Sequence, residues 1–150
     1  MDRIDFQILA LLQTNGRMSN ADLVKKINLL PSACYRRVGQ LEAAGVLDGY
    51  VAVVNQAAMG KPTTVFVDVK LGSQNDEALD AFEKAAHDCP DILECYLMAG
   101  QADYLLHVAV ADVADYQRFH RQYLSRCPGV ARIESSFSLR TVCKRTALPA

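Results

Sequence analysis

Apolar residues in the first 45 positions recur every three or four residues, which is the spacing of one face of an α-helix. Ile4, Ile8, Leu11 and Leu12 lie on such a face. Residue types that commonly end or begin helices divide this stretch into three parts. The first predicted helix ends at Asn15-Gly16, the second begins at Ser19, and the third extends from Pro31 to Gly45. Because only a few residues join the second and third helices, the pattern predicts a helix-turn-helix.

The pattern then changes to that of a strand and a break. Apolar side chains at Leu47, Val51 and Val53 are separated by polar or small residues. We interpret residues 46–54 as a short wing or ribbon strand, so that residues 1–54 form a winged helix-turn-helix domain. Residues 55–62 contain Gly60 and Pro62, which interrupt any periodic element, and we interpret them as a linker.

A disguised internal repeat occupies residues 63–142. Cys89-Pro90-Asp91-Ile92 and Cys127-Pro128-Gly129-Val130 have the same form, and each follows an amphipathic helix and precedes a strand. The helices are predicted at about 75–88 and 113–125, and period-two strands precede them near 65–71 and 104–109. The order β-α-β-β-α-β predicts a ferredoxin-like domain over residues 63–150, and the whole chain is predicted to be α+β. With both helices on one sheet face, the bare face suggests pairing with a second subunit.

The charge distribution limits the class of partner. Apolar residues make up 51% of the 150-residue chain, as in a globular protein, and the formal net charge is −1. A polycation that binds nucleic acid over its whole surface is therefore excluded. Residues 17–37 nevertheless hold five basic side chains against Asp22 alone, so a local basic patch is expected there.

Membrane, metal and secreted classes are not favoured. No apolar run approaches the roughly 18 residues that span a bilayer, and the acidic N-terminus does not resemble a secretory signal. The five cysteines form no C-x-x-C pair, so we expect reduced thiols, a cytoplasmic protein and no metal site or cofactor. His87-x-Cys89 lacks further ligands, Cys34 lies on an apolar helix face, and His107 is expected to be a satisfied sheet-face histidine.

The third helix carries candidate chemistry on one face. Arg36 and Gln40 lie opposite the apolar side, and these residue types pair with guanine and adenine in the major groove. Basic side chains nearby suit phosphates, which add affinity without sequence information. The candidate DNA-binding residues are Arg17, Asn20, Lys25, Lys26, Ser32, Tyr35, Arg36, Arg37 and Gln40. The alternative is a solvated face on a small helical subdomain.

Motifs over nearly the whole chain carry a family resemblance. They are Asp2-x-x-Asp5-x-x-Ile8-Leu9, Leu12-Gln13-x-x-Gly16-Arg17-x-Ser19-Asn20, Pro31-Ser32-x-Cys34-x-Arg36-Arg37-Val38-x-x-Leu41-Glu42-x-x-Gly45-Val46, Gly49-Tyr50, Gly100-x-x-Asp103-Tyr104-Leu105-Leu106, Pro128-Gly129-Val130 and Lys144-x-Thr146-x-Leu148-Pro149. In this order and spacing, the chain resembles the Lrp/AsnC family of feast/famine transcriptional regulators.

The resemblance implies a regulator of transcription that binds double-stranded DNA, responds to an amino acid and forms homodimers that assemble into tetramers, octamers or larger particles. It also implies action near promoters, including the regulator's own.

One position departs from the family: Leu30 stands where a serine usually caps the third helix. A leucine accepts no hydrogen bond from the first-turn amides, at a cost of about 1 kcal/mol, so altered DNA contact is expected. The C-terminal residues 144–149 are expected to be pinned across domains or subunits.

The resemblance also points to the turn Met98–Tyr104 as part of an effector site between dimers. Asp103 suits an ammonium group, and the amides near Gly100 suit a carboxylate. The candidate effector-binding residues are Met98, Gly100, Gln101, Ala102, Asp103, Tyr104, Ser135 and Ser136. An apolar or small amino acid is the default expectation. The alternative is that Gly100 and Asp103 only form a tight turn.

Two further functions stay open beside an effector-responsive regulator. One is an architectural DNA-binding protein without an effector, and the other is a metabolite-sensing domain whose helical head docks protein. No G-x-S-x-G, P-loop or G-x-G-x-x-G fingerprint occurs, so an enzyme is not expected.

Overall fold

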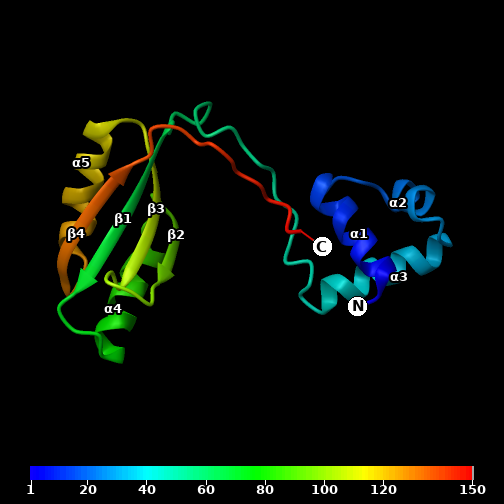
Figure 1. Ribbon diagram of the computed structural model, residues 1–150, viewed down its shortest axis with the longest axis horizontal. Coiled ribbons are helices and arrows are strands. Elements are labelled where there is room, and N and C mark those ends of the chain that lie inside the picture. The colour runs from blue at the N-terminus through cyan, green and yellow to red at the C-terminus, as the bar shows by residue number, and fades with distance from the viewer. Residues whose placement is uncertain (150) are drawn as a thin grey trace. The chain divides into compact units, whose positions relative to one another are not determined.

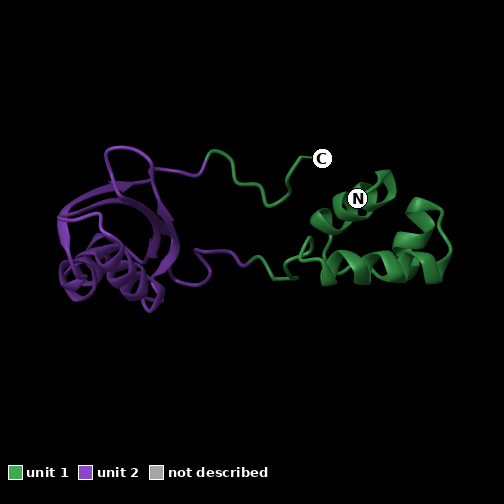
Figure 2. Ribbon diagram, turned by 90° about the horizontal axis from the view of Figure 1, so that it is seen from below, with its two compact units in different colours: residues 1–53, 142–150 green, residues 54–141 purple. Residues whose placement is uncertain are grey.

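The computed structural model describes residues 1–149, which form two compact units (Figure 2). One unit contains residues 1–53 together with the C-terminal segment that begins at Val142. The other contains residues 54–141.

Three helices form the first unit: α1 (Arg3–Thr14), α2 (Asn20–Ile27) and α3 (Pro31–Ala43) (Figure 1). Their starts follow from capping, because Asp2 accepts hydrogen bonds from the first-turn amides of α1 and Ser19 accepts one from the amide of Asp22. The predicted helix-turn-helix is confirmed. The core of this unit consists of Ile8, Leu12, Leu23, Cys34 and Leu41. Cys34 is fully buried as predicted, and burial raises the pKa of its thiol.

The predicted wing strand is not formed. Residues 46–54, all of which the structure describes, contain no strand, and Val51 and Val53 are 88% and 75% exposed. A strand needs a hydrogen-bonded neighbour, and this unit contains no second extended segment paired with these residues among those described. Tyr50 is held instead by a hydrogen bond from its hydroxyl to Glu42.

The second unit is the predicted β-α-β-β-α-β domain. Its strands β1 (Thr63–Leu71), β2 (Ile92–Leu97), β3 (Tyr104–Val110) and β4 (Val130–Phe137) form an antiparallel sheet in the order β2-β3-β1-β4. Helices α4 (Asp76–His87) and α5 (Val113–Gln122), the latter followed by a short 3-10 turn at Leu124–Arg126, cover one face (Figure 1). Alternate β1 side chains, Val65, Val67, Val69 and Leu71, are buried beneath these helices.

The opposite face of the sheet carries the side chains that lie between the buried positions along each strand. Phe66 is 41% exposed there and stacks on the ring of His107, with ring centroids 5.3 Å apart. The Nδ1 atom of His107 lies 2.8 Å from a Glu94 carboxylate oxygen. His107 is therefore the satisfied sheet-face histidine that the sequence predicts.

The compact units depart from the expected domain boundaries in two places. Residues 55–62, expected as a linker, belong to the second unit, where the Lys61 ammonium lies 3.0 Å from Asp115 and 3.4 Å from Asp91. The C-terminal segment from Val142, expected within 63–150, belongs to the first unit instead. The contacts of Lys61 with Asp91 and Asp115 join residues far apart in the sequence, so they have no local sequence signal.

Candidate DNA-binding face and ligand site

Helix α3 presents a polar face because its apolar side is used in the core. Cys34 and Leu41 are buried against α1 and α2, which turns Ser32, Arg36 and Gln40 to solvent. Tyr35, on the flank, is 75% exposed. A guanidinium, an amide and a hydroxyl thus share one accessible face of a helix, as the sequence predicts.

Arg37, the next residue along, does not share that face. Its guanidinium lies 2.9 Å from an Asp2 oxygen and 2.7 Å from an Asp5 oxygen, so it joins α3 to the start of α1. Asp5 and Asp2 already accept backbone amides, and these bonds together with Arg37 lower the pKa of both carboxyls. The expectation that Arg37 contacts DNA is corrected, because two carboxylates within the unit occupy it.

Asn20 is likewise used inside the unit. Its side-chain nitrogen donates to the backbone oxygen of Pro31 at 3.1 Å, which ties the start of α2 to the start of α3. We therefore assign Asn20 to the geometry of the helix-turn-helix and not to an exposed contact.

The remaining predicted cations lie at the surface of the same unit. Arg17 follows α1, whereas Lys25 and Lys26 occupy the last turn of α2, and all three are exposed. The start of α3 has no side-chain cap, unlike the starts of α1 and α2. Leu30 occupies the N-cap position and is 73% exposed. A leucine side chain has no atom that can accept from the first-turn amides, as expected from the sequence.

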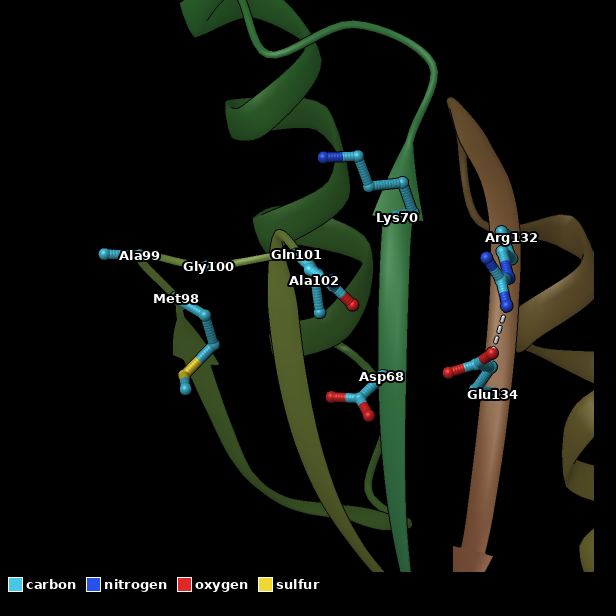
Figure 3. A pocket seen from close by; sticks show the side chains of 9 residues that line it. All are labelled: Asp68, Lys70, Met98, Ala99, Gly100, Gln101, Ala102, Arg132 and Glu134. Atoms are coloured by element: carbon cyan, nitrogen blue, oxygen red, sulfur yellow. Dashed lines mark hydrogen bonds and ion pairs between the residues drawn. The ribbon is translucent and has the colours of Figure 1, made fainter.

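In the second unit, the loop after β2 borders a polar hollow on the open sheet face. Met98, Gly100, Gln101 and Ala102 line it, as does Ala99, and its volume is about 600 Å³ (Figure 3). Four charged side chains that were not predicted form the rest of the wall: Asp68 and Lys70 from β1, and Arg132 and Glu134 from β4.

These four charges form two rows of like sign. Asp68 is the direct cross-strand partner of Glu134, and Lys70 is the partner of Arg132. Figure 3 shows the basic pair near the loop and the acidic pair one step further along the strands. Like charges directly opposite each other disfavour a sheet. Arg132 and Glu134 offset this partly by pairing along β4, while the Asp68 carboxylate has no hydrogen bond or ion pair within residues 1–149.

Asp103 follows the lining residue Ala102 but does not itself line the hollow. Asp103 is 8% exposed, and its carboxylate accepts from the Leu71 amide at 2.7 Å, from the Gln74 side chain at 3.2 Å and from the Lys70 ammonium at 3.3 Å. The Leu71 amide contributes most to a lowered pKa of the Asp103 carboxyl. The expectation that Asp103 receives a ligand's ammonium is corrected, since both oxygens are used to tie the loop to the end of β1.

Two other predicted effector residues point toward the helices. Tyr104 is 1% exposed in the core, and its hydroxyl donates to Glu83 of α4. Burial, and then this hydrogen bond, raise the pKa of the phenol. Ser135 hydrogen-bonds the Tyr116 hydroxyl of α5. Both are corrected to structural roles because strand alternation sends them to the covered face. Ser136 is the cross-strand partner of Phe66 and shares its open face.

Comparison with known proteins finds a matching family model for each of the two parts of the chain. A family model described as "Lrp/AsnC ligand binding domain" matches residues 64–148, and one described as "Winged helix-turn-helix DNA-binding" matches residues 1–48. The chain belongs to the Lrp/AsnC family.

Relatives of this Lrp/AsnC protein are similar over most of their length. The Bkd operon transcriptional regulator of Pseudomonas aeruginosa is 40% identical over 149 residues, which cover 99% of this chain and 97% of that protein. The leucine-responsive regulatory protein of Haemophilus influenzae is 41% identical over 130 residues, covering 87% and 78%. A transcriptional regulator of Neisseria meningitidis, solved in complex with L-Met, has a TM-score of 0.94 and 32% identity, covering 99% and 96%.

This Lrp/AsnC protein is therefore a DNA-binding transcriptional regulator with a ligand-binding domain, and not an enzyme. Among its described residues, no helix has both the length and the apolar character needed to cross a bilayer.

Sequence reasoning missed the four charged residues of the hollow for an identifiable reason. Asp68 and Lys70 are visible as the polar half of the β1 alternation. Their proximity to Arg132 and Glu134 depends on β1 pairing with β4, which lies about sixty residues further along the chain. A ferredoxin-like strand order applied to the predicted strands could have placed the two pairs side by side.

Proposed function

We propose that this Lrp/AsnC regulator reads DNA sequence through the exposed face of α3 and that an amino acid bound in the second unit controls it. The observation that carries the first part is the exposure of Arg36 and Gln40 on a helix whose other side is fixed in the core. A guanidinium can bond guanine bidentately and an amide can bond adenine in the same way.

The other exposed residues fit supporting roles. Arg17, Lys25 and Lys26 are assigned to phosphates, which position the helix without reading sequence. Ser32 and Tyr35 are assigned to the edge of the same contact. In a dimer, two α3 helices enter successive major grooves roughly 34 Å apart.

The hollow of about 600 Å³ has the charges that a zwitterion needs. Lys70 and Arg132, with the backbone amides near Gly100, suit an α-carboxylate, and Asp68 and Glu134 suit an α-ammonium. This arrangement replaces the role first expected of Asp103. The L-Met complex of the Neisseria regulator and the leucine-responsive name of the Haemophilus relative favour an amino acid as the ligand class.

A second copy of the chain is the proposed cover of the open sheet face. Phe66 and Tyr96 are 41% and 48% exposed on that face, beside self-complementary rows of acids and bases. We infer a homodimer that assembles further and works in the cytoplasm, as befits relatives that are bacterial DNA-binding regulators.

A fluorescence-anisotropy titration tests the DNA role. The protein is titrated into DNA from upstream of its own gene and into a scrambled duplex of equal length, at two salt concentrations. Preference for the upstream duplex that persists at higher salt is expected, because base contacts depend less on salt than phosphate contacts do. Equal and salt-sensitive binding to both duplexes would instead favour an architectural protein.

Calorimetric titration with the twenty amino acids tests the effector role. Binding of at least one amino acid is expected, and Arg132→Ala should weaken it tenfold or more by removing a carboxylate partner, an effect of about 1.4 kcal/mol. Arg121→Ala on the outside of α5 is the matched control. Silence across the panel would remove the effector role and leave the DNA role standing.

A further inference from the structure

The described part of the C-terminal segment is hydrogen-bonded to α1 through the side chain of Gln13. The Gln13 amide nitrogen donates to the backbone oxygen of Leu148 at 3.2 Å, and the Leu148 amide donates to the Gln13 oxygen at 2.6 Å. Neither the DNA face nor the hollow uses Gln13 or the motif Lys144-x-Thr146-x-Leu148-Pro149. We call this pair of hydrogen bonds the Gln13 clip.

The clip recognises backbone and not side chains. A primary amide offers a donor and an acceptor side by side, as a peptide group of a neighbouring strand does. The Leu148 side chain is 77% exposed, so apolar burial contributes little to the contact. Chain ends fray unless backbone contacts or burial hold them. Removing the Gln13 amide should therefore release the tail while leaving the helical core intact.

The tail continues directly from the strand that carries half of the charged hollow. Arg132 and Glu134 lie on β4, whose last sheet contact is the hydrogen bond from the Ser138 amide to the Thr64 oxygen. Leu139 and Val142 beyond it are 99% and 86% exposed. The ten residue steps from Ser138 to Leu148 reach at most about 35 Å. The chain thus passes between the units twice, once after Val53 and again before Val142.

We propose that residues 142–149 are a strap, docked on α1 of the same chain by the Gln13 clip, that transmits the ligand state of β4 to the DNA-binding unit. The coupling part of this inference rests on the proposed effector site, whereas the docking part does not. A ligand that moves Arg132 or Glu134 moves the strand from which the strap emerges. A docked strap passes that displacement to α1, and a released strap does not.

Limited trypsin digestion of the full chain, followed by intact mass measurement, tests the docking. Lys144 and Arg145 are exposed cleavage sites next to the clip. Gln13→Ala should accelerate loss of the C-terminal peptide at least fivefold. Gln7→Ala, on the exposed side of the same helix, should leave the rate unchanged. Equal rates for the wild type and Gln13→Ala would overturn the docking, and so would protection that disappears on dilution, because that outcome means docking on a second copy.

Amide hydrogen exchange at Leu148 provides a second readout that does not depend on variant stability. Its N–H donates to Gln13, so it should exchange slowly in the wild type and at the rate of a free peptide in Gln13→Ala. Fast exchange in the wild type would contradict the clip.

The coupling is tested by the change in DNA affinity that a bound amino acid causes. Gln13→Ala, and a chain shortened after Arg145, should both bind the amino acid normally but lose at least two thirds of its effect on DNA affinity. An undiminished effect in both variants overturns the strap. If no amino acid binds the wild type, the proposed effector function fails, while the digestion and exchange results still decide the docking.

Discussion

Arg36 and Arg37 are adjacent in sequence and have different partners. One step along a helix rotates the side chain by about 100°, which separates an exposed face from a packed one. Arg36 is exposed, whereas Arg37 lies between two carboxylates of the N-terminal turn. The sequence analysis predicted that both arginines bind DNA, because it considered the residue type and not the partners of each side chain. Only the position of Asp2 and Asp5, more than thirty residues away, separates their roles.

The charge of Asp103 is expected to stabilise the folded protein in a way that depends on pH. Because its folded-state pKa is lowered below the ordinary value of 3.8, it stabilises the fold above that pH, and the contribution is lost as pH falls through the folded pKa. Asp103→Asn should melt at a lower temperature than the wild type at pH 7, and the difference should shrink as the pH falls below about 4. Thermal melts across this range measure it. A difference that is constant with pH would show that the charge of Asp103 contributes nothing.

At the scale of elements, local signals predicted helices well and strand pairing poorly. The second and third helices begin at Ser19 and Pro31 as expected, because a helix start depends on neighbours within four residues. Residues 46–54 have a strand pattern but no partner strand, so they form no strand, and all of them except Leu47 are exposed. The same reason explains why only part of the hollow was predicted. Its loop residues are neighbours in the sequence, whereas its four charged residues come together only through the pairing of β1 with β4.

Leu30 at the start of α3 gives the prediction at this scale. Leu30→Ser should stabilise the first unit by about 0.5–1 kcal/mol, because a serine hydroxyl can accept a first-turn amide that leucine leaves unbonded. Leu30→Ala is the matched control, since alanine cannot cap either. Urea unfolding of both variants gives the comparison. The account of the N-cap fails if the serine variant is no more stable than the alanine variant.

At the scale of the whole molecule, the two faces of the sheet differ, since helices α4 and α5 cover one face and the other carries exposed aromatic and charged side chains. The covered face holds the core, and the open face holds Phe66, Tyr96 and the charged rows. Exposed aromatic groups beside charges of both signs are typical of a surface that pairs with a copy of itself. This face is the basis of the proposed homodimer, whose partner residues a single sequence does not specify.

The open face predicts how assembly responds to mutation. Phe66→Glu should reduce the particle mass measured by light scattering toward that of one chain, because it places a buried charge in the proposed interface. Val113→Glu, at an exposed position at the start of α5, should leave the mass unchanged. An unchanged mass for the Phe66 variant would place the interface elsewhere.

The most direct test of the central claim is the ratio of affinities for the preferred and scrambled duplexes in the wild type, Arg36→Ala and Lys84→Ala. Lys84 lies on α4 in the other unit and serves as the control. Loss of a base contact should cost about 1–3 kcal/mol, so Arg36→Ala should reduce the ratio roughly tenfold or more. Lys84→Ala should leave the ratio unchanged. A ratio that Arg36→Ala does not alter would contradict sequence reading by the exposed face of α3.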